Sequence, residues 1–177
     1  VEKDWVKRDN GPGYGRDAGF VAIAAMGQYR DAESMGKAAP VTILVVMGRN
    51  SGWLAAATAL GKQDDQDGPH FIAFPEHLFD ETTFTDRVIA AYERYGFALA
   101  VVNENIRDPQ GPLGEQVGPH HVDEFGHVYY HSPARVLADR LSRHLRVRVR
   151  HERPGTIQRS LAACTSNIDA KIGRAHV

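Results

Sequence analysis

The hydrophobic pattern of the chain centres on the segment from Val41 to Leu60, VTILVVMGRNSGWLAAATAL. Val41 to Met47 is an almost unbroken apolar run, which is typical of a strand buried on both faces of a parallel sheet. Ser51 to Leu60 follows as a run of small residues with helical spacing. The segment therefore predicts a buried strand, a turn and a helix.

The rest of the chain repeats this alternation of strand and helix. In the first predicted helix the apolar face is expected at Phe20, Ile23, Ala24 and Gly27. Alternating strands and helices favour a parallel sheet with right-handed crossovers, so we expect an α/β fold with a Rossmann-like, mostly parallel sheet flanked by helices. The other predicted elements are helices over 16–36, 81–95 and 132–145, and strands over 70–74 and 97–103.

The segment RVRVR, Arg146 to Arg150, alternates strictly and predicts one more strand. Val147 and Val149 would face the core, and the arginine face must meet solvent, an acidic partner or an anionic ligand. The first residue is not Met and the last helical pattern stops without a cap, so we expect a single domain that is incomplete at both ends. Its expected parts over 1–177 are a loop (1–15), an α/β core (16–104), a long loop (105–131), and a helix, an arginine-rich strand and a terminal helix (132–177).

The turn after the central strand holds Gly48 and Arg49. Ligands of open α/β sheets bind beyond the carboxyl ends of the strands, where helix N-termini favour anions. Gly48 would let a ligand approach the backbone, and the Arg49 guanidinium matches phosphate or carboxylate. A tight turn with a solvated arginine is the alternative. Glu104 follows the strand predicted over 97–103 and could accept hydrogen bonds from sugar hydroxyls or cap a helix or loop, and Glu76 lies at the same edge.

Eight arginines and no lysine lie between Arg135 and Arg159. Most of them are expected to form a solvated basic face. Arg150, Arg153 and Arg159 differ because they flank the turn Pro154-Gly155-Thr156. Two or three such arginines closing on one phosphate could hold a sugar phosphate in the micromolar to millimolar range.

Composition removes several classes of function. The net charge of −1 argues against nucleic acid or an anionic membrane as a partner. The single Cys164 excludes an internal disulfide and fits a reducing cytoplasm. Without an HExxH pattern or a nearby cysteine, we expect no metal site at the loop histidines, which are His120, His121, His127 and His131.

Several separated blocks resemble the phosphofructokinase family, in family order along nearly the whole chain. The blocks are GPGYG followed by a helix, VMGRNSGWLAAATALGK, FPEHLFD, VVNENIRD, DEFGHVYY, RPGTIQRS and DAKIGRAHV. The style of FPEHLFD, DEFGHV and PGTIQRS is closer to the pyrophosphate-using branch than to the ATP enzymes. The resemblance implies a fold of the phosphofructokinase type.

The resemblance also implies roles for residues that match the family motifs. Met47, Gly48 and Arg49 match the turn that holds fructose 6-phosphate, and Arg49 would also act in catalysis. Glu104 matches a carboxylate that contacts the sugar, and Arg150 an arginine on its 6-phosphate. The segment with a second phosphate arginine matches Thr156, Ile157, Gln158 and Arg159.

Two departures from the family concern catalysis. Counting back without gaps places Glu2 at the catalytic base and Asp4 at the second aspartate of the family, and a longer base would displace the attacking hydroxyl. Val45 stands where many relatives have Glu. The glycine-rich segments that bind the phosphoryl donor belong upstream of this sequence.

The hypothesis is that the chain is the sugar-phosphate half of a phosphofructokinase. Such an enzyme phosphorylates fructose 6-phosphate at O1 to give fructose 1,6-bisphosphate, with pyrophosphate or ATP as donor and Mg²⁺ as cofactor. The resemblance implies a cytoplasmic homo-oligomer, a dimer or tetramer, in the full-length protein. The alternative is a non-catalytic sensor of sugar phosphates or nucleotides. The enzyme hypothesis requires that Arg49 and Arg159 converge on one dianion.

Overall fold

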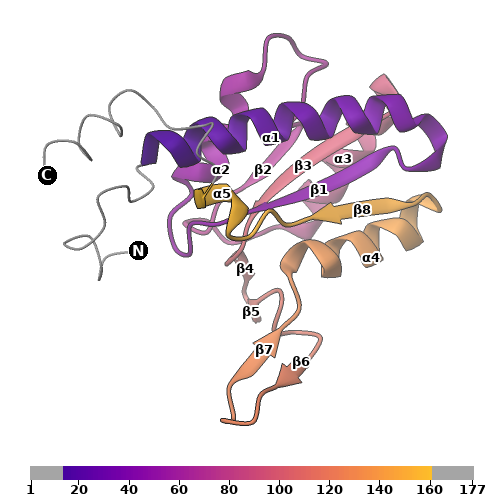
Figure 1. Ribbon diagram of the computed structural model, residues 1–177. Helices are drawn as coiled ribbons and strands as arrows, with labels where there is room; N and C mark the ends of the chain where they lie inside the picture. The colour runs from indigo at the N-terminus through magenta and orange to yellow at the C-terminus, as the bar shows by residue number, and fades with distance from the viewer. Residues whose placement is uncertain (1–13, 161–177) are drawn as a thin grey trace, which may run out of the picture.

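The structure is a computed structural model and describes residues 14–160 of the chain. These residues form a sheet between two layers of helices, with a hairpin projecting from one end (Figure 1). In this part of the chain, no helix is both long and apolar enough to cross a membrane.

The central sheet has four parallel strands in the order β2-β3-β1-β8. All residues of β1 and β3 are buried, because helices cover both faces of the sheet. The expected α/β fold with a mostly parallel sheet is therefore confirmed. The strands are β1 (Val41–Val46), β2 (Phe71–Ala73), β3 (Ala98–Asn103) and β8 (Val149–Glu152).

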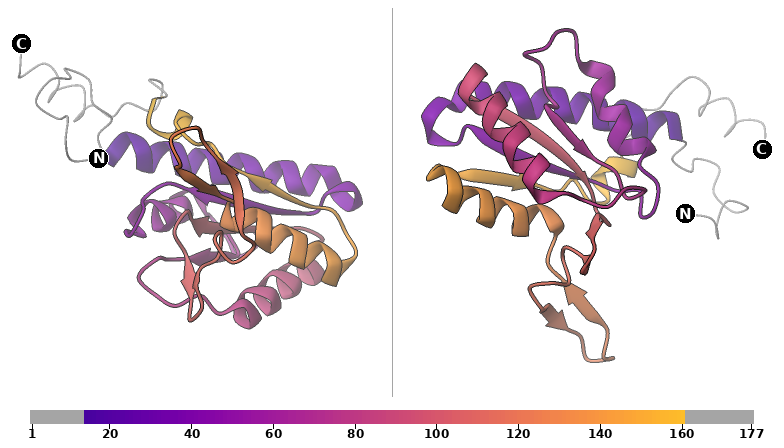
Figure 2. Two further views of the ribbon diagram at one scale, coloured as in Figure 1. Left: turned by 90° about the horizontal axis from the view of Figure 1, so that it is seen from below. Right: turned by 180° about the vertical axis from the view of Figure 1, so that it is seen from behind.

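The helices divide between the two faces of the sheet (Figures 1 and 2). On one face α1 and α2 pack on Leu44 and Val46, and on the other α3 and α4 pack on Ile43 and Val45. The predicted helix after β1 is shorter than expected, because its second half continues as a 3₁₀ helix. The helices are α1 (Tyr14–Met35), α2 (Trp53–Ala57), α3 (Glu81–Tyr95), α4 (Pro133–Leu145) and α5 (Ile157–Ser160), with 3₁₀ turns η2 (Gly36–Ala38) and η3 (Thr58–Gly61).

Helix α1 occupies its predicted place but buries a different face. Ile23 is 58% exposed and Gly27 is exposed, so the prediction of the buried face was wrong. The helix has apolar residues on more than one side, and the side rich in alanine lies closest to the sheet because small side chains permit close packing. The buried residues of this face are Ala18, Val21, Ala25, Tyr29 and Ala32.

The segment 105–131, expected to be a long loop, contains two short antiparallel hairpins. The strands are too short to give a clear alternating pattern in the sequence. The second hairpin projects away from the sheet (Figure 1), and all the residues of its strands are exposed. The hairpins pair β4 (Arg107–Asp108) with β5 (Gly111–Pro112), and β6 (Pro119–Val122) with β7 (Val128–Tyr130).

The arginine-rich strand begins later than the sequence predicted. Arg146 has a left-handed backbone with φ 55° and ends α4, so β8 starts at Val149. Val147 and Val149 pack in the core as expected. Arg150 faces the other way, forms an ion pair with Asp31 of α1 and donates to the Thr42 hydroxyl at 3.2 Å. An acidic partner from the same chain therefore meets the arginine at this position.

Candidate functional site

The candidate site lies at the carboxyl edge of the sheet. Because the strands are parallel, the residues that follow β1, β2, β3 and β8 emerge along this one edge. These residues are Met47, Phe74, Glu104 and Arg153. The edge therefore collects four polypeptide segments that are distant in sequence.

The turn after β1 has a backbone that few residues tolerate. Gly48 has φ 146°, and a Cβ there would lie 2.6 Å from the Ser51 carbonyl oxygen and 2.9 Å from Asn103 Nδ2. Arg49 has φ 46°, a left-handed conformation that costs a non-glycine residue roughly 1–2 kcal/mol. The Ser51 N–H closes the turn by donating to the Gly48 carbonyl at 2.9 Å. Strained backbone conformations cluster at functional sites, so an arginine with this conformation at the carboxyl end of the sheet is consistent with a functional position.

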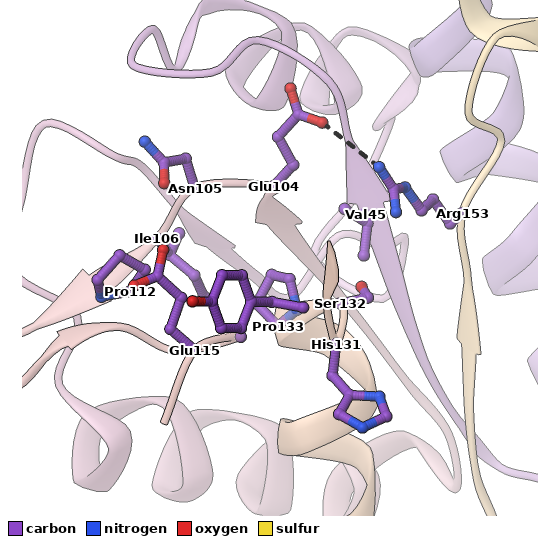
Figure 3. A pocket seen from close by; sticks show the side chains of 12 residues that line it. Val45, Glu104, Asn105, Ile106, Pro112, Glu115, His131, Ser132, Pro133 and Arg153 are labelled. Atoms are coloured by element: carbon purple, nitrogen blue, oxygen red, sulfur yellow. Dashed lines mark ion pairs between the residues drawn. The ribbon is translucent and has the colours of Figure 1, made fainter. Parts of the chain in front are cut away.

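Glu104 holds this turn in place. Its Oε1 accepts hydrogen bonds from the backbone N–H groups of Gly48 at 3.2 Å and of Arg49 at 3.1 Å. Its Oε2 faces the Arg153 guanidinium at 3.8 Å (Figure 3). The carboxylate thus joins three segments, and one of its oxygens is already occupied by the turn.

Gln158 of α5 brings the second predicted motif to the same turn. Its Oε1 accepts a hydrogen bond from the Met47 N–H at 3.0 Å, across 111 residues of sequence. The Gln158 side chain is fully buried, so this contact is shielded from water. The turn at Met47 and the segment from Thr156 to Arg159 therefore meet, although the two are at opposite ends of the fold in sequence.

Glu76 supports the far end of the turn. Its Oε1 accepts from the Gly52 N–H at 2.7 Å, directly before α2. A Cβ on Gly52 would lie 2.6 Å from the Phe74 ring, so a side chain has no room there. The position expected for Glu76 from the sequence agrees with this contact.

A pocket of about 180 Å³ opens beside Glu104, on the α4 side of the sheet (Figure 3). Arg153 lines it together with His131 and Ser132, whose Oγ is buried without a hydrogen-bond partner. Ser132 is the residue directly before α4, but its side chain makes no capping hydrogen bond. Desolvation, with the nearby charge of Arg135, lowers the pKa of His131.

Not every predicted residue reaches this edge. Arg150 aligns with Thr42, near the amino end of β1, about 16 Å along the strand from Met47. Of the remaining predicted residues, Thr156, Ile157 and Arg159 are exposed on and before α5. The residues outside the described range are Glu2, Asp4, Cys164 and the expected terminal helix.

Two residues at the edge were not singled out as site residues. Arg153 was predicted only as one of three arginines that could close on a phosphate, and it is the one that lines the Glu104 pocket. Asn103 ends β3 fully buried, and its Nδ2 donates to the Ser51 carbonyl at 3.1 Å. A polar residue at the end of an otherwise apolar strand was the signal for Asn103. The signal for Arg153 was its place beside the turn Pro154-Gly155-Thr156.

Residues 14–160 offer little to a divalent cation. They contain no group of three or more His, Cys, Asp or Glu side chains placed to hold a metal ion. The edge carboxylates Glu76 and Glu104 each accept bonds from backbone N–H groups instead. In the projecting hairpin, His127 pairs with Asp123 at 2.9 Å. The donor set of this part of the chain therefore does not fit a Mg²⁺ site.

Comparison with known sequences gives one consistent result. A family model described as phosphofructokinase matches residues 18–173. A pyrophosphate–fructose 6-phosphate 1-phosphotransferase of Rhodospirillum rubrum is 38% identical over 98% of this chain, and one of Xanthomonas campestris is 33% identical over 96%. The chain spans 44% and 40% of the length of these two relatives.

Solved structures agree with the sequence relatives. A pyrophosphate-dependent phosphofructokinase from Marinobacter aquaeolei superposes with a TM-score of 0.76 at 27% identity, and one from Nitrosospira multiformis with 0.73 at 26%. Each comparison covers 94% of this chain and 40% of the other. With the matched family model spanning most of its length, the chain belongs to the phosphofructokinase family.

Proposed function

We propose that this chain binds fructose 6-phosphate and forms part of an enzyme that transfers a phosphoryl group to O1 of that sugar. The relatives matched over almost the whole chain are named for this reaction with pyrophosphate. A relative from Corynebacterium efficiens, 32% identical over 67% of the chain, is named an ATP-dependent 6-phosphofructokinase. The family resemblance of the motifs favours pyrophosphate over ATP as the donor.

The observation that carries the proposal is the meeting of two motifs at one turn. Glu104 and Gln158 both bond to the backbone of the turn at Met47, Gly48 and Arg49. These are the residues that the family resemblance assigned to the sugar phosphate. A set of matching residues spread over 111 positions gathers at the ligand-binding edge of the sheet.

In this proposal the residues divide the work by chemistry. Arg49 neutralises negative charge with a fork of N–H donors, and Gly48 permits the tight turn that presents Arg49, because Ser51 and Asn103 leave no room for a side chain there. Glu104 fixes the turn with one oxygen and offers the other to a sugar hydroxyl. The exposed Arg159 stands one residue beyond Gln158 and supplies the second guanidinium for the phosphate.

Arg150 needs a different explanation, since it lies near the amino end of β1. Phosphofructokinases usually share sites between subunits, so we propose a homo-oligomer in which Arg150 serves the site of a neighbouring copy. We also propose that the enzyme uses Mg²⁺ and a phosphoryl donor, both bound mainly outside residues 14–160, and that it is cytoplasmic. Phosphoryl transfer depends mainly on positioning and charge neutralisation, which is the part that the turn residues would supply.

The experiment is calorimetric titration of the purified chain with fructose 6-phosphate. We expect binding in the micromolar to millimolar range, and Arg49→Gln should weaken it about tenfold or more through loss of a charge-assisted hydrogen bond. Arg143→Gln is the matched control, because Arg143 is exposed on α4 and donates to a carbonyl of its own helix. No binding of fructose 6-phosphate, or equal weakening by both variants, would contradict the proposal.

A further inference from the structure

Among residues 14–160, Arg16 is buried and has no partner for its charge. The residue is 8% exposed, and it makes no hydrogen bond and no ion pair with residues 14–160; its Nε is fully enclosed. An isolated charge in a poorly solvated place is costly, and buried guanidinium groups are normally paired. The part of the chain that the structure describes therefore supplies no anion to balance this charge.

The surroundings of Arg16 favour an anion. Arg16 is the third residue of α1, a 22-residue helix whose first N–H groups have no acceptor within the helix. This end of a helix also carries the positive end of the helix dipole. The one acidic residue of the first turn is Asp17, which has an interaction of its own and points about 100° away around the helix.

A second unpartnered donor lies on the helix packed beside it. α5 packs against α1, near the amino-terminal end of α1 in every view (Figures 1 and 2). Gln158 of α5 is fully buried, and its Oε1 must be the atom that faces Met47, because the Met47 N–H needs an acceptor. Its Nε2 is therefore the free end of the amide, and it has no hydrogen-bond partner. A buried donor in this state costs about 1–3 kcal/mol until an acceptor is supplied.

We propose that an oxyanion of the phosphate type binds at the junction of α1 and α5, with the Arg16 guanidinium and the Gln158 amide as its ligands. A tetrahedral dianion has acceptor oxygens in several directions, which suits a guanidinium, an amide and helix N–H groups that approach from different elements. The 8% exposure of Arg16 leaves a route from solvent. Neither residue lines the Glu104 pocket. Gln158 also belongs to the segment proposed for the sugar phosphate, so this inference rests on that proposal and adds an anion position on the α1 side of Gln158.

The direct test is titration of the whole chain with inorganic phosphate, observed by the Nε–H resonance of Arg16 in NMR spectra. Sodium chloride at matched ionic strength corrects for screening. We expect a saturable shift of the Arg16 resonance and a rise in melting temperature with phosphate. Arg16→Gln should weaken phosphate binding about tenfold or more, and Arg16→Lys should retain part of it as a point charge. Arg143→Gln, on a different helix, should bind as the wild type does.

Gln158→Glu provides a sharper variant. The Glu side chain keeps one oxygen for the Met47 N–H and places a negative oxygen where Nε2 was. We expect this variant to be as stable without phosphate as the wild type is with it, and to gain less from added phosphate than the wild type does. Because Gln158 also belongs to the segment proposed for the sugar phosphate, the Arg16 resonance is the readout that is specific to this site.

The opposite results would overturn the inference. If Arg16→Gln lowered the melting temperature by the same amount with and without phosphate, a carboxylate of the chain itself would be the partner. An Arg16 resonance that phosphate leaves unchanged relative to chloride would also overturn it, and this measurement needs no variant to fold.

Discussion

Replacement of Glu104 by Gln tests whether one carboxylate holds the turn at Gly48 and Arg49. The substitution keeps the size of the side chain and an oxygen that can accept the two backbone bonds. It removes the negative charge from both bonds and from the contact with Arg153. Glu104→Gln therefore isolates the electrostatic part of the interaction.

The magnitude follows from the two hydrogen bonds. A bond to a charged group contributes about 1.5–3 kcal/mol and a neutral one about 0.5–1.5 kcal/mol, so each bond loses roughly 1 kcal/mol. The Glu104 side chain is only 21% exposed, so water replaces little of the loss. We expect the free energy of unfolding to fall by about 1–2 kcal/mol, which corresponds to roughly 2–8 °C in melting temperature for a chain of this size.

The measurement is urea unfolding followed by circular dichroism, with Glu93→Gln on the exposed side of α3 as the control. The control should stay within about 0.5 kcal/mol of the wild type, as surface substitutions usually do. If Glu104→Gln also stayed within that range, the carboxylate would not be what orders the turn. A loss of sugar-phosphate affinity without a loss of stability would assign Glu104 to the ligand alone.

Three further outcomes are expected. Arg49→Gly removes the side chain from a residue with a left-handed backbone, so the free energy of unfolding in urea should be unchanged or up to about 1 kcal/mol higher. The affinity for fructose 6-phosphate should fall at least about tenfold. A marked loss of stability would show that the arginine side chain supports the fold. Burial lowers the pKa of His70, whose Nδ1 accepts from a β3 backbone N–H, so its contribution is complete above pH 6.5 and is lost as pH falls below that value. The drop in melting temperature from pH 7 to pH 5 should therefore shrink in His70→Gln, and an unchanged drop would refute the assignment. Gly114→Ala places a Cβ against the His131 carbonyl and should lower the free energy of unfolding by about 1–3 kcal/mol. Gly27 is exposed on α1 with open space around it, so Gly27→Ala should raise the free energy of unfolding by about 0.5–1 kcal/mol. Equal melting temperatures for the two variants would contradict the packing described.

The sequence predicted secondary structure best where the apolar residues fitted only one periodicity, either that of a strand or that of a helix. The apolar run of β1 and the stripe of α3 gave strand and helix nearly to the residue, because Asp80 caps α3 at one end and Gly96 ends it at the other. The α1 face failed because its apolar residues lie on several sides. Periodicity cannot choose between two apolar faces without knowledge of the partner surface.

The sequence predicted which residues lie near the candidate site, but it did not predict the hydrogen bonds that they make there. The position of Glu104 after a strand indicated the edge of the sheet, yet its bonds to the backbone of Gly48 and Arg49 depend on strand order. Arg150 illustrates the opposite case. A residue match placed it with the sugar phosphate, whereas parallel pairing with β1 places it beside Thr42 at the other end. Register is a tertiary property that a match of short motifs does not contain.

The strand order has a consequence for synthesis of the chain. β1 is made early and pairs on one side with β3, but its other side is filled by β8, the last strand of the described sheet to leave the ribosome. Until β8 is made, one edge of the Val-, Ile- and Leu-rich strand β1 is unpaired in the nascent protein. An unpaired apolar edge strand of this kind can pair with other nascent chains and cause aggregation. β8 ends this exposure, and among the described residues it substitutes an outer strand whose exposed His151 and Glu152 disfavour further strand addition. Ribosome-bound products that stop before residue 149 should therefore depend on chaperones more than those that extend past residue 152.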